Sequence, residues 1–455
     1  MRKNCPRIMI AGTGSGCGKT TVTCAVLSAL KQMQKDVTAY KCGPDYIDPM
    51  FHSEVLGTRS RNLDLFLCGE NTLKYLLCRN AGADISVIEG VMGMYDGMGF
   101  ADDRYSATHI ARLTETPQLL VVNVRGKSLS LAAEISGYLR FGENRLAGVI
   151  LNDCTKGMYP VYRELLAEKL PELQVLGYLP HEAEAEVGSR HLGLITAGEI
   201  EDIQSRMALL GKIACETLDM EAILRLAAGA PAIDYEDIPI PRVAEEPVRI
   251  GIARDRAFCF YYQDALDLLT EMGAELVPFS PVHDRSLPEN LSGLILGGGY
   301  PELYLEKLEA NETMRSAVRE AINVGMPTYA ECGGFMFLGE TIAEDDNKFD
   351  MVNAVPGHSF LTKKLVRFGY KELTAQRSGL LCEAGEKIRC HEFHYSDTDV
   401  YGDAFLAANS RGKVWETAHH TESLYAGYPH IHFWSNPSFA ENLVKACAAF
   451  RERAL

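Results

Sequence analysis

The sequence has no long apolar run, no closely paired cysteines and no excess of basic residues. No stretch of 18 or more apolar residues occurs, and the apolar stretch in the start, MRKNCPRIMIAG, is shorter than a signal peptide requires. We therefore predict a cytoplasmic protein without a membrane partner. The thirteen cysteines include no C-x-x-C pair, so neither a disulfide framework nor a zinc knuckle is predicted. With 45 basic and 61 acidic side chains, the net charge of −16 argues against nucleic acid as a partner.

The sequence does have the length and composition of a folded multidomain protein. Its 455 residues predict two or three domains, and its 47% hydrophobic and 23% charged residues are ordinary for a globular chain. Residues 229–247 combine four prolines with a cluster of acids and show no helical periodicity. We therefore predict a linker there, between a domain at 1–228 and a second domain at 248–455.

Both predicted domains show short apolar runs that alternate with helical patterns. In the first, runs such as RIMIAG, DISVIEG and QLLVVNV alternate with helical stretches such as TTVTCAVLSALKQM. After the linker the pattern restarts with VRIGIARD and continues through LSGLILGGG and MPTYAECGG. Unbroken apolar strands between helices are typical of parallel sheets. The sequence thus predicts an α/β protein with two tandem, doubly wound, mostly parallel-sheet domains.

A glycine-rich turn follows the first long apolar strand and leads directly into a helix. Successive backbone N–H groups in such a turn converge on phosphate oxygens, and the positive end of the helix dipole adds to the attraction. The spacing departs from G-x₄-G-K-[ST], because Thr13 stands where the first glycine is expected and Gly12 precedes it. The alternative to a phosphate-binding loop is a glycine-rich turn between strand and helix that binds no ligand. The residues expected to bind the phosphates are Gly12, Thr13, Gly14, Gly16, Cys17, Gly18, Lys19, Thr20 and Thr21.

Four acidic residues follow the ends of predicted strands in the first domain. Asp45 and Asp48 lie in the loop GPDYIDP, Glu89 ends the run ISVIE, and Asp96 follows in GMYDG. Ligands of open α/β sheets bind at this edge, and Mg²⁺ beside a triphosphate requires hard oxygen ligands. Each residue taken alone could equally be a turn-capping Asp or a solvated Glu. Together they favour a magnesium site.

In the second domain, a cysteine lies on a predicted strand-to-helix turn. The strand MPTYA leads into Glu331, Cys332 and two glycines, a context that exposes a nucleophile and lowers the pKa of a thiol. Outside such a turn, a buried structural thiol would be the better interpretation. We expect backbone N–H groups of Gly298, Gly299 and Gly333 to form an oxyanion site.

A nucleophilic cysteine requires a base, and the segment GYPHIHF offers two histidines. His430 and His432 are two residues apart on a predicted strand, so both would face the same side. Either could approach the thiol, and we expect one of them to be structural.

These motifs together resemble a known enzyme family. A dethiobiotin-synthetase-like P-loop domain fused to a class I glutamine amidotransferase domain is similar to the cobyrinic acid a,c-diamide synthases. The resemblance covers nearly the whole chain and rests on segments that include AGTGSGCGKTTVT, YKCGPDYIDPMFH, IEGVMGMYDG, GGGYPE, AECGGFMFLG, CHEFHYS and GYPHIHF.

The resemblance implies a ligase that converts the a and c acetate groups of a corrinoid to carboxamides, with ATP, Mg²⁺ and glutamine. It implies an acyl phosphate intermediate and ammonia released at Cys332, with His430 preferred over His432 as the base. It further assigns Thr20, Asp45 and Glu89 to the metal and Asp45, Asp48 and Asp96 to an acidic substrate site. For the assembly we name a homodimer as the candidate, and the sequence leaves the oligomeric state open.

Two departures from the family pattern leave questions open. Asn123 stands where relatives often have Asp, and no Glu follows either histidine at a spacing of two, so the sequence predicts either a dyad or an acid supplied from elsewhere. Because the substrate is a polyanion and the protein is acidic, we also expect a local basic cluster, with Lys41, Arg104, Arg125 and Lys127 as candidates.

Several rival interpretations remain. Within the enzyme class they are a nickel-sirohydrochlorin a,c-diamide synthase and a cobyric acid synthase that amidates other side chains. Outside it they are a P-loop partitioning or regulatory ATPase and a non-catalytic nucleotide-binding scaffold. Neither of the last two has a use for a second domain with Cys332 and a paired histidine motif.

Overall fold

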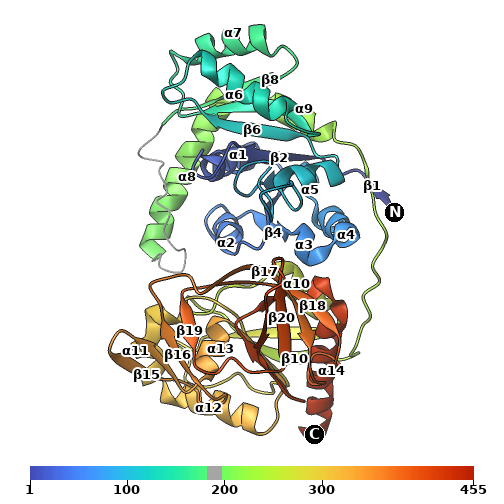
Figure 1. The fold of residues 1–455 in the computed structure, drawn as a ribbon, viewed down its shortest axis with the longest axis vertical. Coiled ribbons are helices and arrows are strands. Elements are labelled where there is room, and N and C mark those ends of the chain that lie inside the picture. Colours follow the sequence, from blue (N-terminus) through green and yellow to red (C-terminus); the bar gives the residue numbers. More distant parts are fainter. Residues whose placement is uncertain (182–196, 455) are drawn as a thin grey trace. The chain divides into compact units, whose positions relative to one another are not determined.

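The computed structural model describes residues 1–181 and 197–454 and divides the chain into two compact units, Met1–Ile238 and Pro239–Leu455 (Figure 1). The division falls inside the segment predicted as a linker. The start of that segment is structured, because β9 (Ile233–Asp234) pairs antiparallel with β1 (Arg2–Lys3). Among the described residues, no helix has the length and apolar character needed to cross a membrane.

The first unit is built on a seven-stranded parallel sheet in the order β4-β3-β5-β2-β6-β7-β8. The central strands are fully buried, which explains their unbroken apolar sequences. The strands are β2 (Arg7–Gly12), β3 (Val37–Cys42), β4 (Arg59–Leu63), β5 (Ile85–Glu89), β6 (Gln118–Asn123), β7 (Leu146–Asn152) and β8 (Gln174–Leu179).

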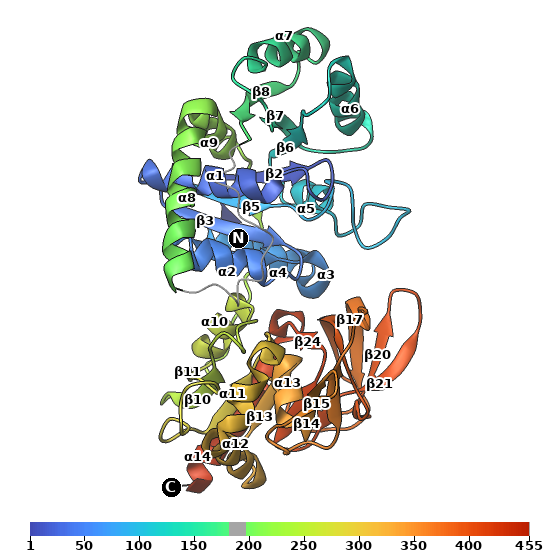
Figure 2. The same cartoon turned by 90° about the vertical axis from the view of Figure 1, so that its left-hand side faces the viewer.

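Helices cover both faces of this sheet, as the alternation along β2 shows. Ile8 and Ile10 pack into the core formed with α1, α2, α8 and α9, whereas Met9 packs on the opposite face with residues of α4 and α5. Figure 2 shows α8 alongside α1. The helices are α1 (Lys19–Gln32), α2 (Ile47–Glu54), α3 (Leu65–Cys68), α4 (Glu70–Asn80), α5 (Ala107–Leu113), α6 (Leu129–Arg140), α7 (Tyr159–Lys169), α8 (Ala197–Thr217) and α9 (Met220–Ala228).

The second unit contains a six-stranded sheet in the order β11-β10-β12-β13-β23-β22, in which only β22 runs antiparallel. Its strands are β10 (Val248–Ala253), β11 (Ala274–Phe279), β12 (Gly293–Leu296), β13 (Thr328–Glu331), β22 (His419–His420) and β23 (Leu424–Gly427). Its helices are α10 (Gln263–Glu271), η3 (Pro301–Tyr304), α11 (Leu305–Ala310), α12 (Glu312–Asn323), α13 (Gly333–Leu338), η4 (Phe433–Ser435) and α14 (Pro437–Ala454). Two tandem α/β domains with mostly parallel central sheets are thus confirmed.

The second unit also holds two sheets that the sequence patterns did not predict. One is mixed, in the order β15-β14-β16-β19, and the other is antiparallel, in the order β21-β20-β17-β18-β24. Of their strands, β15 is largely exposed and β17 mixes buried and partly exposed positions, so both lack the apolar runs of a parallel sheet. They are β14 (Thr341–Glu344), β15 (Asn347–Asp350), β16 (His358–Leu361), β17 (Arg367–Ala375), β18 (Lys387–His394), β19 (Ser396–Thr398), β20 (Phe405–Asn409), β21 (Val414–Thr417) and β24 (His430–Ile431).

Candidate functional sites

The glycine-rich turn predicted to bind phosphate connects β2 to α1 and is held by contacts to its backbone. The Tyr138 hydroxyl donates to the Thr13 carbonyl at 2.6 Å, and the Asn152 side chain donates to the Cys17 carbonyl at 3.1 Å. Gly18 has φ +94°, and a Cβ there would lie 2.0 Å from Asn152 Nδ2, so only glycine fits. The Lys19 ammonium donates to the Gly14 carbonyl at 2.8 Å, which places it over the turn.

A buried network of charges lies next to this turn, where β3 and β5 end. Glu89 is fully buried, and its Oε1 accepts from the Thr20 hydroxyl at 2.7 Å and from the Lys41 ammonium at 2.9 Å. Lys41 also contacts Asp48 Oδ2 at 2.5 Å, and His52 Nε2 lies 3.6 Å from Glu89 Oε2. The side chains predicted from separate motifs therefore meet at one point beside the P-loop.

Burial and charge shift the pKa values in this network in opposite directions. Burial raises the pKa of Glu89, and Lys41 acts against that rise. For Lys41, burial disfavours the ammonium, but Glu89, Asp48 and Asp45 outweigh it and raise the pKa. Burial lowers the pKa of His52 to about 4, so this imidazole is neutral at pH 7. Glu89 and Lys41 thus stabilise each other's charged forms.

Asp45 and Asp96 hold loops through backbone contacts. Asp45 Oδ1 accepts from the N–H groups of Ile47 and Asp48, at 2.8 and 3.0 Å, at the start of α2. Asp96 Oδ2 accepts from the Gly93 N–H at 2.8 Å. Both acids thus have the loop-capping role that was the alternative to metal binding.

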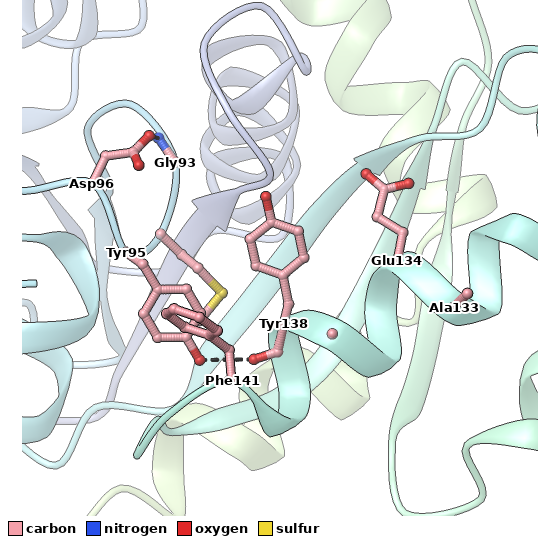
Figure 3. A pocket seen from close by; sticks show the side chains of 9 residues that line it. Gly93, Tyr95, Asp96, Ala133, Glu134, Tyr138 and Phe141 are labelled. Atoms are coloured by element: carbon pink, nitrogen blue, oxygen red, sulfur yellow. Dashed lines mark hydrogen bonds between the residues drawn. The ribbon is translucent and has the colours of Figure 1, made fainter. Parts of the chain in front are cut away.

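Asp96 also lines an open pocket of about 440 Å³ beside the P-loop (Figure 3). The rings of Tyr95, Tyr138 and Phe141 gather on one side of it, and Tyr95 donates to the Tyr138 carbonyl at 2.7 Å. Because Tyr138 also bonds to the carbonyl of Thr13, the wall of this pocket is fixed to the P-loop itself.

Three of the four candidates for the expected basic cluster are paired with acids. Lys41 is buried in the network described above, Arg104 pairs with Asp102 at 2.9 Å, and Lys127 pairs with Glu134 at 2.6 Å. Arg125 is exposed. Asn123, the residue that departs from the family pattern, donates to Asp153 at 3.2 Å and accepts from the Arg125 backbone N–H at 2.8 Å.

In the second unit, Cys332 lies on a sharp turn between β13 and α13. Its φ is +49° and its ψ is −109°, an unusual conformation for a residue other than glycine, and it is only 7% exposed. Backbone strain of this kind at a strand-to-helix turn is typical of a nucleophile. The turn that was predicted to expose Cys332 therefore leaves this residue nearly buried.

The three glycines predicted for an oxyanion site pack around this turn. A Cβ on Gly333 would lie 3.2 Å from the Gly299 nitrogen, so these two backbones lie close together. Gly299 has φ +157°, and a Cβ there would lie 2.2 Å from the Ala257 carbonyl oxygen. A Cβ on Gly298 would lie 2.5 Å from His430 Cε1. The absence of a side chain at Gly298 thus leaves room for His430.

His430 lies beside Cys332 and also contacts an acid that the sequence patterns did not assign. Its Nδ1 is 3.3 Å from Glu331 Oε1, and it forms a side-chain hydrogen bond with Cys332. Burial disfavours the imidazolium, but Cys332 and Glu331 outweigh it and raise the pKa of His430 to about 10. The only sequence signal for this acid is its position directly before the cysteine.

His432 does not share this environment, although it is two residues away. β24 ends at Ile431 and the chain turns into η4, so the alternation of a strand does not continue. The His432 ring packs at 4.6 Å from the Tyr262 ring, and burial lowers its pKa to about 3. The structure therefore pairs His430, and not His432, with Cys332 and Glu331.

Comparison with known proteins matches each unit to a family. Residues 8–195 match the CobQ/CobB/MinD/ParA nucleotide binding domain, and residues 249–438 match the CobB/CobQ-like glutamine amidotransferase domain. The chain is 38% identical to a protein of Clostridium tetani named cobyrinate a,c-diamide synthase, over 96% of this chain and 99% of the other. It is 39% identical to one of the same name from Caldanaerobacter subterraneus, over 98% and 99%. The chain therefore belongs to the cobyrinate a,c-diamide synthase family.

Proposed function

We propose that this protein catalyses the ATP- and glutamine-dependent amidation of the a and c carboxylates of cobyrinic acid. The observation that carries the proposal is the presence in one chain of a P-loop with Lys19 and a strained Cys332 beside His430. A partitioning ATPase or a scaffold uses only the first of these. The matched relatives named cobyrinate a,c-diamide synthase support the corrinoid substrate.

In the second unit, the thiolate of Cys332 attacks the carboxamide carbon of glutamine. Backbone N–H groups at Gly299 and Gly333 stabilise the tetrahedral oxyanion, and collapse of that intermediate breaks the C–N bond. His430 donates a proton to the departing ammonia, and water then hydrolyses the thioester to glutamate. The buried position of His430 keeps this proton from exchanging freely with solvent.

In the first unit, the substrate carboxylate is inert toward ammonia until its oxygen becomes a leaving group. It attacks the γ-phosphate of ATP and forms an acyl phosphate, which ammonia displaces to give the carboxamide and phosphate. Lys19 and the backbone of the turn stabilise the charge on the transferring group. Lys41 pairs with both Glu89 and Asp48, which lowers the repulsion that a substrate carboxylate meets at this centre.

The residues present fit a magnesium ion between Thr20 and Glu89. Glu89 Oε2 is buried without a hydrogen-bond partner among the described residues, and Thr20 Oγ1 lies 2.7 Å from the other carboxylate oxygen. Mg²⁺ usually takes one or two protein ligands together with phosphate oxygens and waters. When bound, it supplies charge neutralisation on the phosphates. Within residues 1–181 and 197–454, no set of three His, Cys, Asp or Glu side chains is arranged to hold a metal alone.

We assign the enzyme to the cytoplasm, and a homodimer is part of the proposal. All thirteen cysteines are free in the structure, as in a reducing compartment.

Light scattering on the purified protein tests the dimer, for which a mass near twice 50.2 kDa is expected. A mass of one chain would contradict it.

The deciding experiment is Cys332→Ser, assayed with cobyrinic acid, ATP and either glutamine or ammonia. Glutamine-dependent product should be lost while ammonia-dependent product is retained, because only the nucleophile of the second unit is removed. Loss of both activities, or of neither, would contradict the proposal. Cys259→Ser is the matched control, since its thiol donates to the Arg256 carbonyl and a hydroxyl can do the same. A parallel assay with nickel-sirohydrochlorin separates the closest alternative.

A further inference from the structure

We propose that Glu331 is the positioning residue that orients His430 for the glutaminase step, in place of an acid following the histidine. The inference rests on the glutaminase half of the proposed function. Glu331 precedes the nucleophile directly, so one turn of chain supplies both the thiol and the acid. The histidine comes from β24, about a hundred residues later in the chain.

Glu331 is held in a single orientation by contacts to both of its carboxylate oxygens. Its Oε1 lies 3.3 Å from His430 Nδ1, and its Oε2 accepts from the Ile431 N–H at 3.2 Å and from the Tyr329 hydroxyl. The side chain is 6% exposed. A carboxylate fixed in this way does not need to be ordered during the reaction.

The contact at Nδ1 determines which nitrogen of His430 performs the chemistry. Because Nδ1–H donates to Glu331, the other ring nitrogen, Nε2, is left for the hydrogen bond with Cys332. Nε2 can then take the thiol proton and later give it to the departing ammonia. Without the acid, the imidazole can rotate or adopt the other tautomer, which is unproductive.

The charged and titratable groups around His430 come from two elements. Glu331 and Cys332 face it from the end of β13, and both favour the imidazolium. His391, its register partner on β18, and His394 on the same strand oppose it when charged, but burial lowers the pKa of both. Glu331 is thus the acid that balances the imidazolium in this buried site.

A purely structural role for Glu331 makes a different prediction. The Ile431 N–H and the Tyr329 hydroxyl both donate, and the amide oxygen of a glutamine could accept from both of them. The amide nitrogen, however, cannot accept from His430 Nδ1–H and carries no charge. Glu331→Gln therefore preserves the contacts that hold β24 and removes only the interaction with His430.

The test is Glu331→Gln in the full chain, with the kinetics of glutamine hydrolysis measured against pH. We expect kcat to fall about 10²-fold to 10⁴-fold while KM for glutamine changes little, since the acid acts in the transition state. The alkaline limb of the pH profile should move to lower pH, because loss of the negative charge lowers the pKa of the His430 imidazolium. Alkylation of Cys332 by iodoacetamide at pH 7 should slow for the same reason.

Two controls separate this result from misfolding and from failure of the proposed function. Glu309→Gln removes a carboxylate that also accepts a backbone N–H, from Asp350 at 2.8 Å, in the same unit, and should leave glutamine hydrolysis unchanged. Ammonia-dependent synthesis by Glu331→Gln should equal that of the unchanged protein. If Glu331→Gln keeps kcat within about threefold and the same alkaline limb, the inference is wrong. If the unchanged protein does not hydrolyse glutamine, the proposed function itself fails.

Discussion

The two proposed catalytic centres of this chain are assembled in different ways. In the first unit, the functional groups follow the ends of neighbouring parallel strands, and Lys41 pairs with Asp48 at 2.5 Å and with Glu89 at 2.9 Å. In the second unit, Cys332 comes from the parallel sheet, while His430 comes from the antiparallel one. The P-loop centre is thus built at the edge of a single sheet, whereas the glutaminase centre depends on how two sheets of the second unit pack together.

This difference decides what each centre tolerates. Lys41 compensates part of the negative charge of the P-loop centre, so removing Lys41 would leave Glu89 buried without its cation, which is costly. The glutaminase centre holds a single histidine between a thiol and an acid, so its activity depends on orientation rather than on total charge. Substitutions in the two units should therefore separate synthesis from glutamine hydrolysis.

The largest effect should come from Lys19→Ala, which separates the two activities completely. Synthesis from either glutamine or ammonia should fall by at least about 10³-fold, because the point charge on the transferring phosphate is lost. Glutamine hydrolysis should persist, since Cys332 and His430 lie in the other unit. Product formation and glutamate release, measured in the same reaction, check this. Loss of glutamate release as well would show that the two centres are obligately coupled.

The next largest effect should distinguish the two histidines of the GYPHIHF segment. His430→Asn should lower kcat for glutamine hydrolysis by about 10²-fold to 10³-fold, because the general base is removed. His432→Phe retains an aromatic ring against Tyr262 and should leave kcat near that of the unchanged protein. Steady-state glutaminase kinetics of both variants check the assignment. A larger loss in His432→Phe than in His430→Asn would reverse it.

Acid should destabilise the second unit more than the first. Burial lowers the pKa of His391 to about 3, of His420 to about 4 and of His432 to about 3. Below pH 6.5 these histidines bind protons in the unfolded chain but stay neutral in the folded protein. The free energy of unfolding therefore falls as the pH drops from 6.5 toward 4. Glu302, whose pKa burial raises to about 7, opposes part of this. The net loss between pH 6.5 and 5 is on the order of 3 kcal/mol.

In the first unit the corresponding changes have opposite signs. His52 behaves like the histidines above, but burial raises the pKa of Asp45 and Glu89, whose folded forms bind protons more readily as the pH falls. Hydrogen exchange measured by mass spectrometry at pH 7.5 and 5 should show protection lost mainly in peptides from 239–455. Equal loss in both units would contradict the prediction, and His432→Phe should reduce the loss in the second unit.

Sequence patterns could predict the P-loop centre more completely than the glutaminase centre, and the reason is topological. The carboxyl ends of parallel strands meet at one edge, so strand order along the chain was enough to place Glu89 and Asp48 together. Glu331 could not be assigned to His430, because its direction depends on the turn at Cys332 and on the pairing of β24 with β18. The expectation that both histidines face the same side was wrong, since β24 is too short for strand alternation to reach His432, but the preference for His430 agrees with its contact to Glu331.

The smallest effect concerns the fit of His430 against the β12 end of the site. Gly298→Ala places a methyl group where a Cβ lies 2.5 Å from His430 Cε1, so the imidazole must shift from its present position. A displacement of less than about 1 Å should lower kcat for glutamine hydrolysis about tenfold, because proton transfer depends steeply on geometry. Gly137→Ala is the control, since a Cβ there meets nothing within 4 Å and lies in the first unit. Gly298→Ala should retain ammonia-dependent synthesis. An unchanged kcat for glutamine hydrolysis in Gly298→Ala would show that the imidazole has more freedom than its contacts indicate.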